Sequence, residues 1–185
     1  MDLYDCPGLV ARAMADIRRS YRPVLDAVAE AGRMGGDRGY GQYGFWHDRP
    51  FQVVQSDVIC MLSREQFRQW VLPALEEECA CHDRIYFHLD GPGALRHLDD
   101  ILGIPGHWIL QWQPGAGQKP NWQWLETLKK AQAAGKAVHV FGAGLNLEAV
   151  QSLHRELDPA LVAYTPALQS EAEARALLAW LERNT

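Results

Sequence analysis

The sequence predicts an α/β protein built from parallel βα units. Four short apolar segments rich in strand-forming residues alternate with segments in which apolar residues recur every three or four positions. Strands separated by single helices cannot pair as hairpins, so they lie parallel and are covered by helices on at least one face. A barrel and a doubly wound sheet both meet this requirement. The strands are expected at 85–89, 108–112, 137–141 and 161–164.

Composition restricts the class of protein and its partners. The 185 residues fit one domain spanning 1–185, and 48% hydrophobic with 22% charged residues is typical of a globular chain. A net charge of −5 without clustered Lys and Arg argues against nucleic acid as a partner. No apolar run approaches the roughly 20 residues that span a bilayer, and the N-terminus does not resemble a signal peptide. We therefore expect a cytoplasmic protein that binds neither nucleic acid nor membrane.

The N-terminal third is predicted to hold a helix and then a loop. Apolar residues from Leu9 to Val28 fall on one helical face, and Pro23 is expected to kink or split that helix. The glycine-rich stretch 32–44 indicates a loop. A further strand is expected nearby, in either 40–46 or 51–54.

Local signals place the ends of the later helices. Serine followed three residues later by Gln or Glu is typical of a capping box, and glycine at a helix end favours a left-handed terminal residue. Pro73 is expected to kink the helix after Ser63. The expected signals are the boxes Ser63/Gln66 and Ser170/Glu173, a cap at Asn121 and a helix end at Gly135.

Polar residues followed by glycine stand where each predicted strand ends. In parallel α/β folds, functional groups gather at the carboxyl edge of the sheet. His88 and Asp90 follow the first strand and point to one face, because alternate strand residues do. We expect them to share a cavity with three polar side chains of the next strands. The candidate substrate-binding residues are Gln111, Trp112, Gln113, Gly115, Gly117 and His139, with His47 and Asp57 as further pocket-lining candidates.

The pair His88 and Asp90 suits two kinds of chemistry. An imidazole and a carboxylate can ligate a divalent ion such as Zn²⁺, or the carboxylate can orient the imidazole for proton transfer. A buried hydrogen-bonded pair without catalytic function is the alternative. The glycines after this strand favour a functional site because they permit close approach of a ligand.

Other candidate motifs are weaker. Gly115-x-Gly117 and Gly142-x-Gly144 could present backbone N–H groups to an anion, but neither belongs to a dinucleotide or P-loop motif. Cys79-x-Cys81-His82 lies at the end of a predicted helix, where the side chains diverge, so no metal cluster is expected there.

Longer runs of the sequence resemble a known family. The run Tyr86-Phe-His-Leu-Asp-Gly-Pro-Gly-Ala-Leu-Arg-His-Leu-Asp99, continued by Ile104-Pro-Gly and Gln111-Trp-Gln-Pro-Gly-Ala-Gly117, is similar to a segment of uroporphyrinogen-decarboxylase-like proteins. Weaker similarity extends over nearly the whole chain. The resemblance implies the C-terminal half of a (β/α)₈ barrel.

Two chemistries are implied by this resemblance. The superfamily includes cofactor-free decarboxylases of tetrapyrrole acetate groups and zinc-dependent methyltransferases that act with a corrinoid protein. In the methyltransferases a His-x-Cys pair supplies zinc ligands, and His88-x-Asp90 is similar by position, with Asp in place of Cys. Cys81 is the last cysteine of the chain, which counts against the same zinc site. The decarboxylases also need residues of an N-terminal half of the barrel, which the resemblance does not cover and which we expect this chain to lack.

These expectations lead to one main hypothesis and one rival. The main hypothesis is an enzyme-derived half-barrel whose His88 and Asp90 act on a tetrapyrrole, a corrinoid-bound methyl group or another small molecule. The rival is a non-catalytic binding or scaffold subunit that completes another chain's barrel. Because a half-barrel leaves unpaired edge strands, a homodimer or an N-terminal-half partner is expected in either case.

Overall fold

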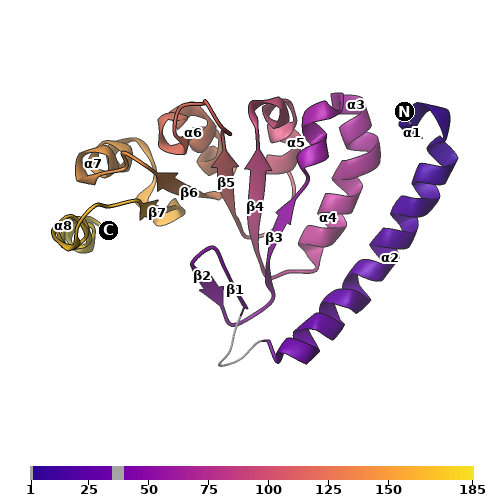
Figure 1. Cartoon of the computed structure of the whole chain (residues 1–185), viewed down its shortest axis with the longest axis horizontal. Helices are drawn as coiled ribbons and strands as arrows, with labels where there is room; N and C mark the ends of the chain where they lie inside the picture. The colour runs from indigo at the N-terminus through magenta and orange to yellow at the C-terminus, as the bar shows by residue number, and fades with distance from the viewer. Residues whose placement is uncertain (1, 35–39) are drawn as a thin grey trace.

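A computed structural model describes residues 2–34 and 40–185, and its centre is a parallel sheet (Figure 1). Five strands lie in the order β3-β4-β5-β6-β7, and every neighbouring pair is parallel. The predicted α/β fold is thereby confirmed, and the arrangement is consistent with a partial βα-barrel-like unit. The strands are β3 (Phe51–Gln55), β4 (Arg84–Asp90), β5 (Trp108–Gln113), β6 (Ala137–Gly142) and β7 (Val162–Pro166).

Helices connect the strands and bury one face of the sheet. On that face Phe87 of β4, Leu110 of β5 and Val140 of β6 are each at most 1% exposed, and they belong to one core cluster with helix residues. Burial of such apolar surface is the main stabilising contribution in a domain of this kind. The helices are α3 (Arg64–Gln66), α4 (Leu72–Ala80), α5 (Leu98–Leu102), α6 (Leu125–Ala133), α7 (Leu147–Glu156) and α8 (Glu171–Asn184).

The predicted helix ends are largely confirmed. Ser63 and Gln66 form both hydrogen bonds of a capping box, and Gly135 adopts a left-handed φ of +74° after α6. Ser170 accepts from the Glu173 N–H, but the Glu173 carboxylate binds the Gln169 N–H instead of completing the box. A π-helical turn, Phe67–Val71, precedes α4 and its Pro73, where a kink was expected.

The N-terminal helix packs loosely against the rest of the chain. α1 (Asp2–Asp5) leads into α2 (Pro7–Gly32), which continues through Pro23 without a break. α2 packs against α4, where Arg18 pairs with Glu77. Leu9, Ile17, Val24 and Val28 remain 56–64% exposed, so only part of the predicted apolar face is covered. Among the described residues, no helix is long and apolar enough to cross a membrane.

A small hairpin covers part of the sheet face that the helices leave free. Its strands are β1 (Tyr40–Gln42) and β2 (Phe45–His47), which pair antiparallel. Of the two stretches proposed for one additional strand, 51–54 lies in β3, whereas 40–46 contains β1, the turn Tyr43-Gly44 and part of β2. Tyr43 stacks on Tyr86 of β4 with ring centroids 5.1 Å apart, and Tyr86 is 1% exposed.

Candidate functional site

A row of polar side chains crosses the hairpin-side face near the carboxyl ends of the strands. The sheet register places His88 opposite Gln111, and Gln111 opposite His139. Asp90 and Gln113 form the next pair toward the carboxyl edge. The predicted co-location of these five residues on one sheet face follows from this register.

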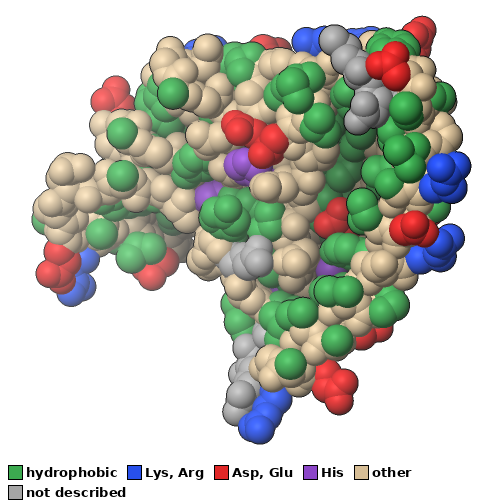
Figure 2. Space-filling view, turned by 45° about the vertical axis from the view of Figure 1, so that its right-hand side comes forward, with side chains coloured by type: hydrophobic (Ala, Val, Ile, Leu, Met, Phe, Trp, Pro, Cys, Tyr) green, Lys and Arg blue, Asp and Glu red, His purple; other side chains and the backbone are tan. Residues whose placement is uncertain are grey.

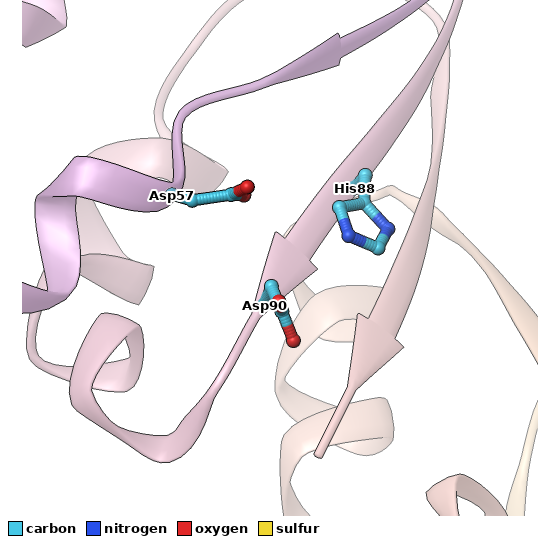
Figure 3. A group of neighbouring side chains, drawn as sticks. All are labelled: Asp57, His88 and Asp90. Carbon is cyan, nitrogen blue, oxygen red and sulfur yellow. The ribbon is translucent and has the colours of Figure 1, made fainter. Parts of the chain in front are cut away.

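Asp57 joins His88 and Asp90 to form a group of three potential metal ligands (Figure 3). One ligand atom from each residue lies within 4.8 Å of the other two. Asp57 is exposed at the start of a short 3-10 helix, Asp57–Met61, whereas His88 and Asp90 are half-buried on β4. The sequence marked Asp57 only as a pocket-lining candidate, because no local signal connects it with β4.

Close packing between two loops brings Asp57 to this position. The 3-10 helix Asp57–Met61 lies against the turn after β4, where Gly93 approaches Cys60 so closely that an added Cβ would meet its backbone at 3.3 Å. The Cys60 thiol also donates to the backbone oxygen of Asp90, at 3.1 Å. The glycines after β4 therefore permit approach of the protein's own backbone, a role that the sequence had assigned to a ligand.

Gln111 determines which nitrogen of His88 faces the carboxylates. The side-chain oxygen of Gln111 is bonded to Nδ1 of His88, and since an amide oxygen only accepts, Nδ1 carries the proton. In the neutral form of the ring, Nε2 is then the nitrogen that can offer a lone pair to a cation. Figure 3 shows one ring nitrogen on the side of the two carboxylates and the other on the opposite side. This arrangement is typical of metal-binding histidines, whose second nitrogen is held by a hydrogen bond.

The three side chains can supply one nitrogen and two carboxylate oxygens to a divalent cation. Such a mixed donor set suits Zn²⁺, Mn²⁺ or Fe²⁺ better than Cu⁺, which prefers thiolates. Three protein ligands leave coordination positions for water or substrate, as in catalytic metal sites. Among the described residues, this is the group of His, Cys, Asp and Glu side chains that converges well enough to hold an ion.

A cavity of about 560 Å³ adjoins this group at the carboxyl ends of β5, β6 and β7. Gln111 belongs to its wall as well as to the hydrogen bond with His88, so it links the two features. A volume of this order is in the range of small-molecule sites. The lining residues are Tyr43, Tyr86, Gln111, His139, Phe141, Gly142, Thr165, Pro166 and Ala167.

His139 stands at the base of this cavity between two hydroxyl groups. Its Nδ1 lies 2.7 Å from the Tyr86 hydroxyl and its Nε2 lies 2.6 Å from the Thr165 hydroxyl. Burial lowers the pKa of His139 to about 4, so the ring is neutral at pH 7, with one nitrogen donating and the other accepting. Sequence analysis missed Thr165, because the last strand was expected to end one residue earlier.

Asn121 has a different role from the predicted helix cap. α6 begins after Trp124, and Asn121 is buried at 2% exposure. Its side-chain nitrogen donates to the backbone oxygens of Trp112 and His139, and its oxygen accepts from the Phe141 N–H. Asn121 thus joins the ends of β5 and β6, because its amide satisfies backbone groups that the sheet leaves unpaired there.

Some predicted site residues lie away from the cavity. Trp112, predicted as a substrate-binding residue, lies on the helix side of the sheet, is 0% exposed and packs edge-on against Trp124. His47 lies in the hairpin beside a different cavity at the amino end of the sheet. Gly115 and Gly117 have left-handed φ values in the loop after β5, and neither is part of the carboxyl-end cavity wall.

Cys79, Cys81 and His82 do not form a converging group of ligand atoms among the described residues. Cys79 is buried in the core, and the Cys81 thiol donates to the backbone oxygen of Glu77. His82 contacts the Tyr21 hydroxyl at 2.8 Å.

Comparison with known proteins found no relative of this chain. No family model, no curated protein and no solved structure matches this chain.

Proposed function

We propose that this protein is an enzyme that binds a divalent cation at Asp57, His88 and Asp90 and acts on a small carboxylated molecule in the adjoining cavity. The main support for the proposal is the convergence of Asp57, His88 and Asp90, together with the hydrogen bond with Gln111 that orients the His88 ring. Among the described residues, neither carboxylate lies at ion-pair distance from His88, so the three groups are spaced for an ion between them and not for direct contact. The site also lies at the sheet edge where parallel α/β enzymes hold their substrates.

The surrounding side chains suit recognition of such a substrate. When bound, the cation would polarise a carboxylate or carbonyl oxygen of the substrate. Gln111 and Thr165 present polar groups in the cavity, while Tyr43 and Phe141 offer aromatic surface for an apolar part of the molecule. His139 is neutral and hydrogen-bonded on both sides, so it can take up a proton at one nitrogen while releasing one from the other.

The resemblance to uroporphyrinogen-decarboxylase-like proteins implies two activities for this cavity, of which only methyl transfer uses a metal ion in that superfamily. Decarboxylation of a tetrapyrrole side chain and methyl transfer with a corrinoid protein both remain proposals. Two carboxylates with one imidazole provide no thiolate ligand, so the donor set is less similar to the methyltransferase site than to an oxygen-rich site for a carboxylated substrate.

Cation binding tests the proposal directly. Protein stripped with a chelator should bind one Mn²⁺ per chain, measured by electron paramagnetic resonance of the free ion, and Zn²⁺ should displace it. His88→Ala and Asp90→Asn should each weaken binding at least a hundredfold. The exposed His107 supplies a matched control, since His107→Ala removes an imidazole away from the three ligands. Equal Mn²⁺ binding by the control and the His88 variant would refute the site.

Access of a substrate to the cation can be measured without knowing the substrate. Oxalate is a small carboxylate that coordinates Mn²⁺, so it should displace water and reduce the proton relaxation enhancement of the Mn²⁺-loaded protein. An enhancement that oxalate leaves unchanged would indicate a closed, structural ion, and would favour the rival hypothesis of a binding or scaffold subunit.

We further propose that a second copy or an N-terminal-half partner completes the barrel. β3 and β7 are the edges of the described sheet, and α2 lies outside α4 on the β3 side (Figure 1). α2 carries exposed apolar residues, and Figure 2 shows hydrophobic side chains at the surface on this side of the molecule. The hairpin already covers Tyr86, so the edges are more suitable than the inner faces for contact between two copies. Light scattering at micromolar concentration should give twice the chain mass of 20.8 kDa. The mass of a monomer would refute the homodimer and leave only the hypothesis of a separate N-terminal-half partner.

A further inference from the structure

A second cavity, of about 310 Å³, lies at the opposite end of the sheet, between the hairpin and the first residues of the strands. Phe45 and Trp46 of the hairpin form one wall, and Trp108 and Ile109 of β5 form another. The volume is at the lower end of the range for small-molecule sites, and apolar walls with a few polar groups are their usual composition. The proposed enzyme site does not use this cavity.

The hairpin separates the two cavities. Phe45 lines the amino-end cavity and also packs against the rings of Tyr86 and His139, at 5.6 and 5.1 Å between centroids. Tyr86 therefore stands between the two spaces, with its hydroxyl directed to His139 at the carboxyl-end cavity. A ligand in one cavity does not occupy the other.

Arg84 brings a positive charge to the amino-end cavity. It is the first residue of β4, half-buried, on the same sheet face as Tyr86 and His88. Its guanidinium donates to the backbone oxygen of its neighbour Asp83, at 2.9 Å, and within the described residues no carboxylate lies at ion-pair distance from it. The Asp83 carboxylate faces Arg49 instead, at 3.7 Å. A guanidinium beside aromatic walls without a carboxylate is a ready partner for an anion.

Two histidines in the same cavity wall add hydrogen-bonding capacity. Nδ1 of His47 lies 3.0 Å from the Arg49 N–H, 3.3 Å from the Arg49 backbone oxygen and 3.4 Å from the Asp48 carboxylate, so Nε2 is the ring nitrogen left to contact a ligand. His107, which is exposed, lies next to Trp108 in the wall. The polar side chains that line this cavity are thus one guanidinium and two imidazoles, whereas the carboxyl-end site offers two carboxylates.

From this complementarity we infer that the amino-end cavity binds a small aromatic carboxylate. The carboxylate pairs with the Arg84 guanidinium in the two-pronged geometry that a planar fork favours, and the ring lies against the apolar walls. The positive charge of Arg84 selects for the carboxylate group, and the aromatic walls select for the aromatic ring. The inference does not depend on the cation site or on the activity proposed above.

The test compares two probes that differ only in charge. Naphthalene-2-carboxylate and the neutral naphthalene-2-carboxamide have the same rings, so a preference for the carboxylate measures recognition of the anion. Isothermal titration should show at least tenfold tighter binding of the carboxylate. The indole N–H signals of Trp46 and Trp108 should shift in the NMR spectrum, because both residues line the cavity. Equal affinities for the two probes, or no binding of either, would overturn the inference.

Three variants locate the site. Arg84→Gln should reduce carboxylate affinity to that of the carboxamide, whereas Arg155→Gln, which removes an exposed guanidinium from α7, should leave it unchanged. Ala137→Leu places extra atoms in the cavity and should weaken both probes. Circular dichroism and urea unfolding check that each variant is folded. Wild-type affinity in folded Arg84→Gln would contradict the assignment of the head group.

The cation site provides the last control. Folded His88→Ala should bind naphthalene-2-carboxylate as the wild type does, even after it has lost Mn²⁺. A parallel loss of the aromatic probe would show that the probe occupies the carboxyl-end site, which would overturn the amino-end assignment and leave the metal proposal standing.

Discussion

The side-chain oxygen of Gln111 is hydrogen-bonded to Nδ1 of His88, and this contact links the candidate cation site to the carboxyl-end cavity. The two residues are register partners on β4 and β5. Gln111 therefore positions the imidazole from the neighbouring strand, in the way that outer residues of metal sites hold their histidine ligands.

Replacement of Gln111 should weaken cation binding without removing a ligand. Gln111→Leu eliminates the acceptor for the Nδ1 proton, so the ring loses its preferred orientation, and Mn²⁺ affinity should fall about 10- to 100-fold. Gln111→Glu keeps an acceptor and should retain most of the affinity. Isothermal titration measures both, with Gln118→Leu on the exposed loop as the control. An unchanged affinity in Gln111→Leu would exclude this positioning role.

Gly93 should affect the affinity for the cation, although it is not one of the ligands. Its φ lies outside the left-handed region, yet a Cβ there would meet backbone atoms of Cys60 at 3.3 Å and push the Asp57 segment away. We expect Gly93→Ala to weaken Mn²⁺ binding by about tenfold. This is comparable to the effect of removing a residue that contacts a metal ligand but not the metal itself. Gly8→Ala on exposed α2 places its Cβ in ordinary van der Waals contact with the Arg12 guanidinium, at 4.0 Å, and should stabilise the fold by up to about 1 kcal/mol. Equal Mn²⁺ affinity in the two variants would show that Cys60 yields without moving Asp57.

Asn121→Ala should lower the free energy of unfolding by about 2–4 kcal/mol, because it leaves a buried N–H and two backbone oxygens without a side-chain partner. Urea unfolding measures this loss. The matched control is Asn146→Ala, which removes one exposed helix cap to the Ala149 N–H and should cost about 1 kcal/mol. Similar losses in both variants would mean that the Asn121 bonds are replaced by water.

The buried His139 should make stability depend on pH between about 6.5 and 4. In the unfolded chain this imidazole binds a proton near its ordinary pKa of about 6.5. In the folded chain, burial lowers the pKa to about 4. Between pH 6.5 and 4 the unfolded state binds more protons than the folded state. The contribution of His139 to the free energy of unfolding is therefore complete above pH 6.5 and is lost as the pH falls toward 4. The loss is at most about 3 kcal/mol, from the size of the shift.

NMR titration of the His139 ring protons measures this pKa directly, and urea unfolding of wild type and His139→Gln at pH 7.5 and 4.5 measures its effect on stability. The variant should lose less stability on acidification than the wild type. Ring signals that titrate near pH 6.5 would show that His139 becomes protonated in the folded state at no extra free-energy cost, which would contradict the prediction.

Much of the fold could be predicted because the strands carry a strong local signal. In β4 and β5 alternate residues face the helices and are all buried, whereas the opposite face is only partly buried except at Tyr86 and Gln111. β-branched and aromatic residues distinguish these strands from the helices between them. The same alternation brought His88 and Asp90 to one face and into register with Gln111 and Gln113. It also implies that Trp112, one position from Gln111, points into the helix layer, where the structure places it.

The sequence by itself determined the order of strands and helices, most of the helix caps and the pairing of His88 with Asp90, because each depends on residues close together in the chain. Only the tertiary structure decided that Asp57 joins that pair, that Thr165 bonds to His139, that Asn121 ties two strands together, and that the hairpin creates a separate cavity around Arg84. These relationships arise from packing between segments that are distant in the chain, and local propensity and periodicity carry no information about which distant segments will meet.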